Sequence, residues 1–147
     1  MASGVESFER FAERYPNGDV LMAPKGSGRP YGTNPYVGYD GAAKPFLFHG
    51  RYADSVPPLA RVVVVGDQAW TLDLLMKQHT IEAGDLVLTW EPGQSSALDA
   101  ATIDAGRDIG NVVVQRRTPQ GMQDAVYDVT FVFAFRAFHP NGTLRWE

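Results

Sequence analysis

The chain has 147 residues, of which 44% are hydrophobic and 20% charged, a balance typical of one folded domain and too apolar for a disordered chain. The formal net charge of -4 argues against a nucleic-acid partner, because binding a phosphate backbone needs a cationic surface. The absence of cysteine excludes disulfides, thiolate metal sites and thiol catalysis. We therefore expect a single domain over residues 1–147.

No apolar run approaches the roughly 20 residues that cross a bilayer, so we expect no membrane insertion. Residues 1–4 lead straight into an amphipathic stretch without an apolar signal region. The expectation is a soluble chain whose compartment the sequence does not fix.

An amphipathic helix is predicted near the N-terminus, over Val5–Tyr15. Its apolar residues, among them Phe8 and Phe11, recur with helical spacing, and Pro16-Asn17-Gly18 ends it. Asp19–Met22 is predicted to be a short strand.

Residues 23–58 form a stretch rich in glycine, proline and aromatic residues. A loop of this length is uncommon in a compact domain and is usually functional or mobile. Because its aromatic side chains would be costly to leave in water, we predict an ordered wrap that the aromatic rings hold on the core. These residues are Tyr31, Tyr36, Tyr39, Phe46, Phe48 and Tyr52.

The middle of the chain predicts strands joined by turns. Arg61–Val65 contains four consecutive valines, which indicates a buried strand. Gly66-Asp67-Gln68 predicts a hairpin turn back through Ala69–Leu72, and a short helix is predicted over Leu72–His79. Further strands are predicted at Asp85–Trp90, Asn111–Arg116 and Tyr127–Phe131.

Two segments fit more than one structure. Ser96–Ile103 fits a strand or a helical turn, and Thr130–Phe138 has both alternating and helical spacing. A repeated sequence phrase helps to assign Thr130–Phe138. The aromatic-Pro-Asn-Gly phrase at Tyr15–Gly18 returns at His139–Gly142, each time after aromatic residues three or four apart, and we call this repetition the echo. The echo predicts a strand running into a final short helix, and it indicates an internal repeat.

Five or six strands joined by short turns, with a helix at each end, favour a mainly β (α+β) fold. We expect a small antiparallel barrel or half-barrel.

Several phrases occur in an order that resembles a known family. The most specific lies within Arg29–Asp40, and the others are Pro45–Gly50, Pro57–Val65, Trp90–Asp99 and Gly106–Gly110. Together they resemble the C-terminal part of domain-of-unknown-function family 3179, whose members are prokaryotic and often look exported. The resemblance implies no activity.

The chain departs from that family in two places. The N-terminal part of longer members, which includes a Cys-containing strand, is absent. A Gly-Ser-Thr-Trp-like segment expected after Arg117 is replaced by the short turn Thr118–Asp124. An activity that needs either part is not expected here.

The segment from Tyr31 to Asp40 is the best candidate for ligand binding. Its tyrosines offer flat amphipathic surfaces and its polar residues offer acceptors, on a loop of the kind that often carries binding groups. The competing interpretation is a wrap whose tyrosines pack and close one end of a barrel. Outside this segment, His49 is a polar candidate, and Arg107 in Gly-Arg-Asp-Ile-Gly has the side chain that clamps an anion, or forms a local ion pair in a turn. The ligand-binding candidates are Tyr31, Asn34, Tyr36, Tyr39, Asp40, His49, Arg107 and Asp108.

No metal or cofactor is predicted, because His49, His79 and His139 lack the spacing of metal ligands. Ser95-Ser96 lacks the Gly-x-Ser-x-Gly elbow of a hydrolase, so nucleophilic hydrolysis is not favoured.

Three functions remain open. The favoured one is a β-rich module that binds a small molecule or a protein. The second is a small enzyme that uses Asp40, His49, Arg107 and Asp108 at a barrel mouth. The third is a repeat unit that forms a homodimer through Phe8, Phe11, Phe135 and Phe138.

Overall fold

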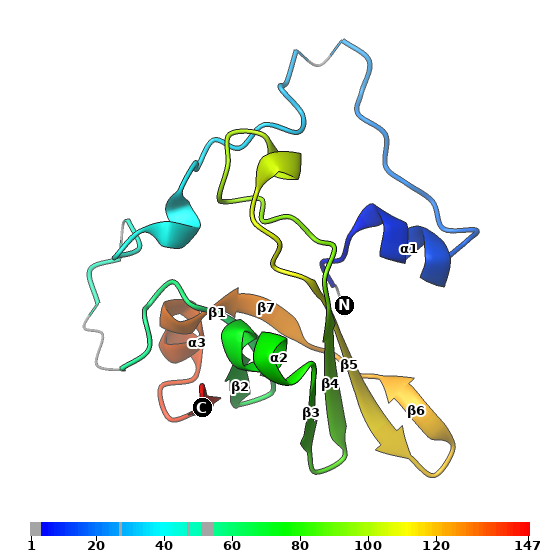
Figure 1. Cartoon of the computed structure of the whole chain (residues 1–147), viewed down its shortest axis with the longest axis vertical. Helices are drawn as coiled ribbons and strands as arrows, with labels where there is room; N and C mark the ends of the chain where they lie inside the picture. Colours follow the sequence, from blue (N-terminus) through cyan, green and yellow to red (C-terminus); the bar gives the residue numbers. More distant parts are fainter. Residues whose placement is uncertain (1–3, 27, 47, 51–54) are drawn as a thin grey trace.

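The computed structural model describes residues 4–26, 28–46, 48–50 and 55–147. Within these ranges, eight short strands form two four-stranded sheets, with three α-helices (Figure 1). In chain order the elements are α1 (Phe8–Arg14), β1 (Arg61–Val65), β2 (Gln68–Thr71), α2 (Leu72–Gln78), β3 (Thr80–Ala83), β4 (Leu86–Glu91), β5 (Asn111–Thr118), β6 (Gly121–Asp124), β7 (Asp128–Phe131), α3 (Val132–Phe138) and β8 (Thr143–Arg145), with 3-10 turns η1 (Tyr39–Gly41) and η2 (Ile103–Ala105).

The first sheet has the order β7-β1-β2-β8, and the second has the order β3-β4-β5-β6. Neighbouring strands are antiparallel except β2 and β8, which are parallel. The mainly β prediction is confirmed, but in the described ranges there is no closed barrel, and eight strands replace the expected five or six. Helix α2 starts directly after β2, with Thr71 as its N-cap, so the hairpin cannot continue into β3 and the strands divide into two sheets.

Strand β1 is buried on both faces, which explains its run of valines. Val63 and Val65 pack with Trp70 and the α2 residue Leu75. Val62 and Val64 face the other way, into a second cluster with Phe135 of α3. The chain therefore places one helix on each side of β1, and a strand in that position has no polar face.

The two helices that share the sequence echo also share their local geometry. The residues that follow α1 and α3, Tyr15 and His139, both have φ -130° and ψ 69°. Phe11 in α1 and Phe135 in α3 each accept a bond from that residue's N–H, at 2.8 and 2.7 Å. The two predicted helices and their C-terminal ends are thus confirmed, although α1 begins at Phe8 rather than Val5. Their origin in a duplication stays a prediction.

After the helices the two phrases differ. Thr143–Arg145 forms strand β8, whereas Asp19–Met22 is not a strand and Leu21 is 99% exposed. The strand prediction for Asp19–Met22 is wrong because no sheet edge lies beside it in the described part of the chain. Ser96–Ile103 is also irregular, apart from the start of η2.

The wrap is held by backbone hydrogen bonds to the loop between β4 and β5. The N–H of Asn34 donates to Ala101 at 2.9 Å, and the N–H of Gly38 donates to Asp99 at 2.7 Å. Rings add to this, since Tyr39 lies edge-on to Phe131 with centroids 5.9 Å apart. Residues 34–39 of the wrap are therefore seated against the loop 94–110 and the start of α3, whereas residues 23–26 and 28–31 are exposed. Tyr52 lies outside the described residues.

Candidate functional site

A buried carboxylate lies where the wrap meets the first sheet. Asp40 is in the turn η1, directly after Gly38 and Tyr39, and its side chain is 0% exposed. Gly38 has φ 73°, a left-handed conformation that glycine adopts at little cost, and this turn directs the Asp40 side chain inward. A carboxylate without solvent requires donors from the protein.

Three side chains supply those donors. The Nη2 atom of Arg61, the first residue of β1, lies 3.1 and 3.2 Å from the two Asp40 oxygens. Arg107 Nη2 donates to Asp40 Oδ2 at 3.3 Å, and the Ser96 hydroxyl donates to the same oxygen. The network joins the wrap, β1 and the loop between β4 and β5. The Asp40 carboxylate in its centre bonds the guanidinium of Arg107 on one side.

Arg61 and Arg107 differ in their access to solvent. The Arg61 side chain is 15% exposed and its guanidinium carbon lies 5.1 Å from the centroid of the Phe131 ring. Its Nε atom is buried and has no hydrogen-bond partner among the described residues. The Arg107 side chain is 52% exposed, and among those residues it donates only to Asp40. Arg107 is thus the cation that a dissolved molecule reaches.

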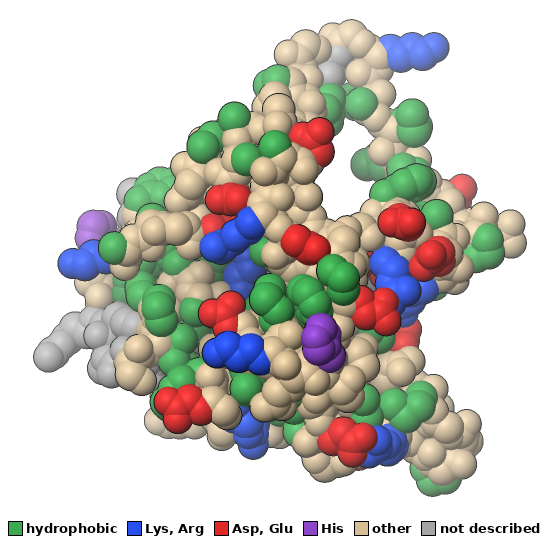
Figure 2. All heavy atoms as spheres, viewed as in Figure 1, with side chains coloured by type: hydrophobic (Ala, Val, Ile, Leu, Met, Phe, Trp, Pro, Cys, Tyr) green, Lys and Arg blue, Asp and Glu red, His purple; other side chains and the backbone are tan. Residues whose placement is uncertain are grey.

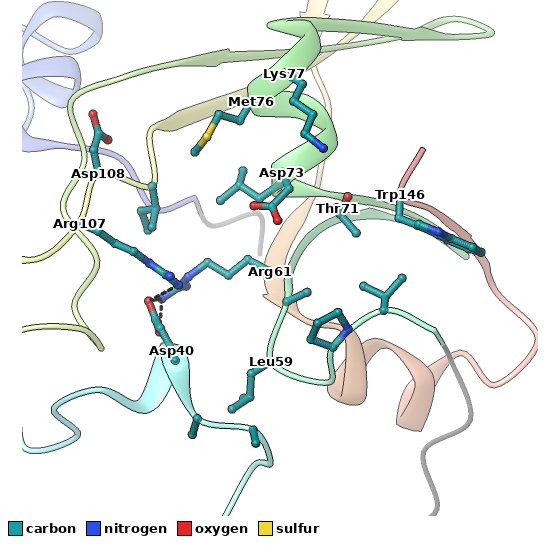
Figure 3. Close-up of a pocket in the computed structure, with 18 of the residues that line it drawn as sticks. Asp40, Leu59, Arg61, Thr71, Asp73, Met76, Lys77, Arg107, Asp108 and Trp146 are labelled. Carbon is teal, nitrogen blue, oxygen red and sulfur yellow. Dashed lines mark hydrogen bonds and ion pairs between the residues drawn. The ribbon is translucent and has the colours of Figure 1, made fainter.

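A pocket of about 630 Å³ opens above this network. Figure 3 shows Arg61 and Arg107 extending toward Asp40 at one end, with α2 forming the facing wall. Helix α2 contributes Asp73, Met76 and Lys77 to the lining. The remaining lining comes from residues 41–43, 55–57, 59, 60, 71, 72, 108, 109 and 146.

Asp108 lines the pocket, but its carboxylate is used by the loop. It accepts bonds from the N–H groups of Gly93, Gln94 and Gly110, at 2.8, 3.1 and 2.7 Å. Burial alone would raise the pKa of Asp108, but these bonds favour the charged form and the net effect lowers its pKa. Asp108 therefore shapes the loop that presents Arg107.

The structure brings together three of the eight predicted candidates, Asp40, Arg107 and Asp108, at one pocket. Asn34 is buried, donates to Ala100 O at 3.0 Å and accepts from the Tyr36 N–H, so it holds the wrap. His49 is exposed and is not part of this lining.

None of the predicted tyrosines lines the pocket, and Tyr36 and Tyr39 form an aromatic cluster with Phe46. Tyr36 and Phe46 stack with centroids 6.1 Å apart, and they are 51% and 57% exposed. Tyr31 is also exposed, whereas Tyr39 is half-buried between Phe46 and Phe131. The packing interpretation thus fits Tyr39 and does not fit Tyr31.

Sequence reasoning missed Arg61, Ser96, Asp73 and Lys77. One signal was available for Arg61, because a cation at the start of an otherwise apolar buried strand needs a buried partner. Asp73 and Lys77 are separated by one helical turn, a spacing also common on solvent-exposed helices.

Three further observations concern classes of site. In the described ranges, no group of three or more His, Asp or Glu side chains is arranged to hold a metal ion. None of the helices within those ranges has the length and apolar character that crossing a membrane requires. The face drawn in Figure 2 carries acidic and basic side chains interspersed, without an extended area of one charge.

Comparison with known proteins gives one match. Residues 1–142 match the family described as "Protein of unknown function (DUF3179)", which confirms the resemblance that the motifs predicted. No curated protein and no solved structure matches the chain.

Proposed function

Because the chain belongs to the DUF3179 family, whose description names no activity, we propose a function from the pocket itself: the domain binds a small molecule that carries a carboxylate or phosphate group. The observation that supports this most directly is the state of Arg107. Its side chain is half exposed and lines the pocket, and its guanidinium is bonded to a carboxylate that has no access to water.

A cation fixed in this way suits an anion. Guanidinium groups match the geometry of carboxylates and phosphates with paired donors. Asp40 uses one Arg107 nitrogen, Nη2, and among the described residues the other donors of that side chain are uncommitted. Since Asp40 already holds the group in position, less side-chain entropy is lost when an anion binds.

The walls of the pocket favour a molecule that is partly apolar. Leu59, Met76 and Ile109 line it together with Arg107 and Lys77. A few charged groups within a largely apolar lining are typical of small-molecule sites.

The positions of the polar groups favour binding over a reaction. Ser96 is fully buried and its hydroxyl donates to Asp40, so a substrate does not reach it. Asp40 is enclosed by Arg61, Arg107 and Ser96 and has no side-chain exposure. The enzyme alternative also relied on His49 and a barrel mouth, and neither lies at this pocket.

Protein binding is a second candidate, which the stacked and half-exposed pair Tyr36 and Phe46 supports. Adjacent exposed aromatic side chains are typical of interaction sites. Replacing Tyr36 by Ala is expected to weaken capture of a partner by the folded protein, without a change in its unfolding midpoint. For the homodimer patch, Phe135 is 1% exposed and packs in the core, so it is not available for an interface.

The proposal is tested by calorimetric titration of the protein with acetate, hexanoate, inorganic phosphate and phenyl phosphate. We expect at least one of these probes to bind, and Arg107→Gln to weaken it about 10- to 100-fold, the effect of a hydrogen bond to a charged group. Arg116→Gln is the matched control, because Arg116 is also half exposed and paired with one carboxylate, Asp85, on the second sheet. Equal affinities for the native protein and Arg107→Gln would contradict the proposal.

A further inference from the structure

The pocket carries an acidic group opposite its arginine. Asp73 lies on α2, on the wall that faces Arg107, and Figure 3 shows its carboxylate directed into the shared space. Asp73 is exposed and forms no hydrogen bond or ion pair through its side chain within the described residues. The pocket therefore presents opposite charges on facing walls.

Arg107 and Asp73 lie on facing walls of the pocket, and Lys77 adds a second exposed cation on the α2 wall. Asp40 is paired with Arg61, and Asp108 is engaged by backbone N–H groups, so neither carboxylate is free. Lys77 is one turn after Asp73, yet the two do not form an ion pair. A ligand that carries only a negative charge would leave Asp73 uncompensated and would be repelled by it.

A second feature lies on the side of the pocket away from Arg107, beyond Asp73. Trp146 lines the pocket beside Thr71 and is 41% exposed (Figure 3). An indole face attracts an alkylammonium group through its π electrons, and a nearby carboxylate adds direct attraction. Together, Asp73 and Trp146 have the composition of a site for a cationic amine.

We infer that the pocket binds a zwitterion: an amino acid-like molecule whose carboxylate lies at Arg107 and whose ammonium group lies between Asp73 and Trp146. This inference rests on the proposed function, since it assigns the ligand class of the same pocket. The apolar lining from Leu59 and Met76 then contacts the carbon chain that joins the two charges.

The test uses a series of ω-amino acids against carboxylates of equal chain length. Glycine, 4-aminobutyrate and 6-aminohexanoate are titrated in parallel with acetate, butyrate and hexanoate. We expect one amino acid, whose length matches the span of the pocket, to bind at least tenfold more tightly than its carboxylate. Asp73→Asn is expected to remove that advantage and to leave carboxylate affinity unchanged or improved.

The outcomes separate this inference from the proposal beneath it. If carboxylates bind as well as amino acids, and Arg107→Gln still abolishes binding, the zwitterion inference fails and anion binding stands. If no member of either series binds but inorganic phosphate or phenyl phosphate does, the zwitterion inference fails and anion binding stands; if none of these probes binds, both fail. Asp104→Asn serves as the control for Asp73→Asn, because Asp104 is exposed and lies in η2, outside the pocket lining; an equal loss in both variants would also overturn the inference.

Discussion

Replacing Asp40 by asparagine tests the network that supports the pocket. The substitution keeps the size of the side chain but removes the charge that faces Arg61, whose side chain is 15% exposed. In either orientation the amide nitrogen also faces a guanidinium nitrogen, of Arg61 or of Arg107, so at least one bond becomes a contact between two donors. Breaking one partner of a buried ion pair costs about 3–5 kcal/mol, because the remaining charge stays buried without compensation.

The loss of stability caused by Asp40→Asn cannot exceed the free energy needed to detach the wrap locally from the sheets. If detaching the wrap requires less than the cost of the mispaired network, the wrap opens and the sheets stay folded. We therefore expect either a lower midpoint of urea unfolding, followed through the three tryptophans, or loss of hydrogen-exchange protection at the Gly38 and Asn34 amides.

The control is Asp85→Asn, which removes a half-exposed carboxylate paired with Arg116. An exposed pair contributes about 1 kcal/mol or less, so the urea midpoint should change little. The reasoning is refuted if Asp40→Asn leaves both the urea midpoint and the exchange of the wrap amides as they are in the native protein.

Three other predictions concern glycines and one loop carboxylate. Gly110→Ala should lower the free energy of unfolding by about 3 kcal/mol, because φ is +71° and the new methyl group would meet the buried Trp90 ring. Gly121→Ala should lower it by only about 1 kcal/mol, because φ is also positive there but the space around the residue is open. Gly142→Ala should lower the free energy of unfolding by about 1–3 kcal/mol, and Gly18→Ala by less. A methyl group at either site comes within 2.6 Å of a phenylalanine ring, but Phe135 is held in the core, whereas Phe11 is part-exposed and can move away. Equal losses in urea unfolding would contradict this prediction. The pKa of Asp108 is lower in the folded state than in the unfolded state. Its stabilisation is therefore present above the unfolded pKa, near pH 4, and is lost as the pH falls through the folded pKa. Asp108→Asn should make the urea midpoint less sensitive to pH between about 5 and 3, the range in which aspartate titrates, and an unchanged pH dependence would refute the assignment.

The sequence predicted the elements whose cause is local. Four consecutive valines indicated β1, and Pro-Asn-Gly marked the ends of α1 and α3. The missed strands have no such local cause. Strand β3 depends on its pairing with β4, all four residues of β6 are exposed and depend on pairing with β5, and β8 is three residues placed in parallel on β2. Long-range pairing of this kind leaves little trace in hydrophobic periodicity.

The site was predicted in part for the same reason. Asp40 and Arg107 stood out because each lies in a glycine-rich phrase, and 67 residues separate them in the chain. The sequence indicated at most that Arg61 needs a buried partner, and that this partner is Asp40, shared with Ser96, appears only when the wrap is folded onto β1 and the loop before β5. His49 lies elsewhere, because nothing in its local sequence determines where the wrap turns.

The central claim is that Arg107 holds an anionic ligand in the pocket between the wrap and α2. The most direct measurement is a methyl NMR titration of the protein with hexanoate, beside the Arg107→Gln variant. The account predicts that methyl signals of Leu59, Met76 and Ile109, which line the pocket, shift in the native protein and remain still in the variant. Shifts confined to other methyl groups, or equal shifts in both proteins, would contradict it.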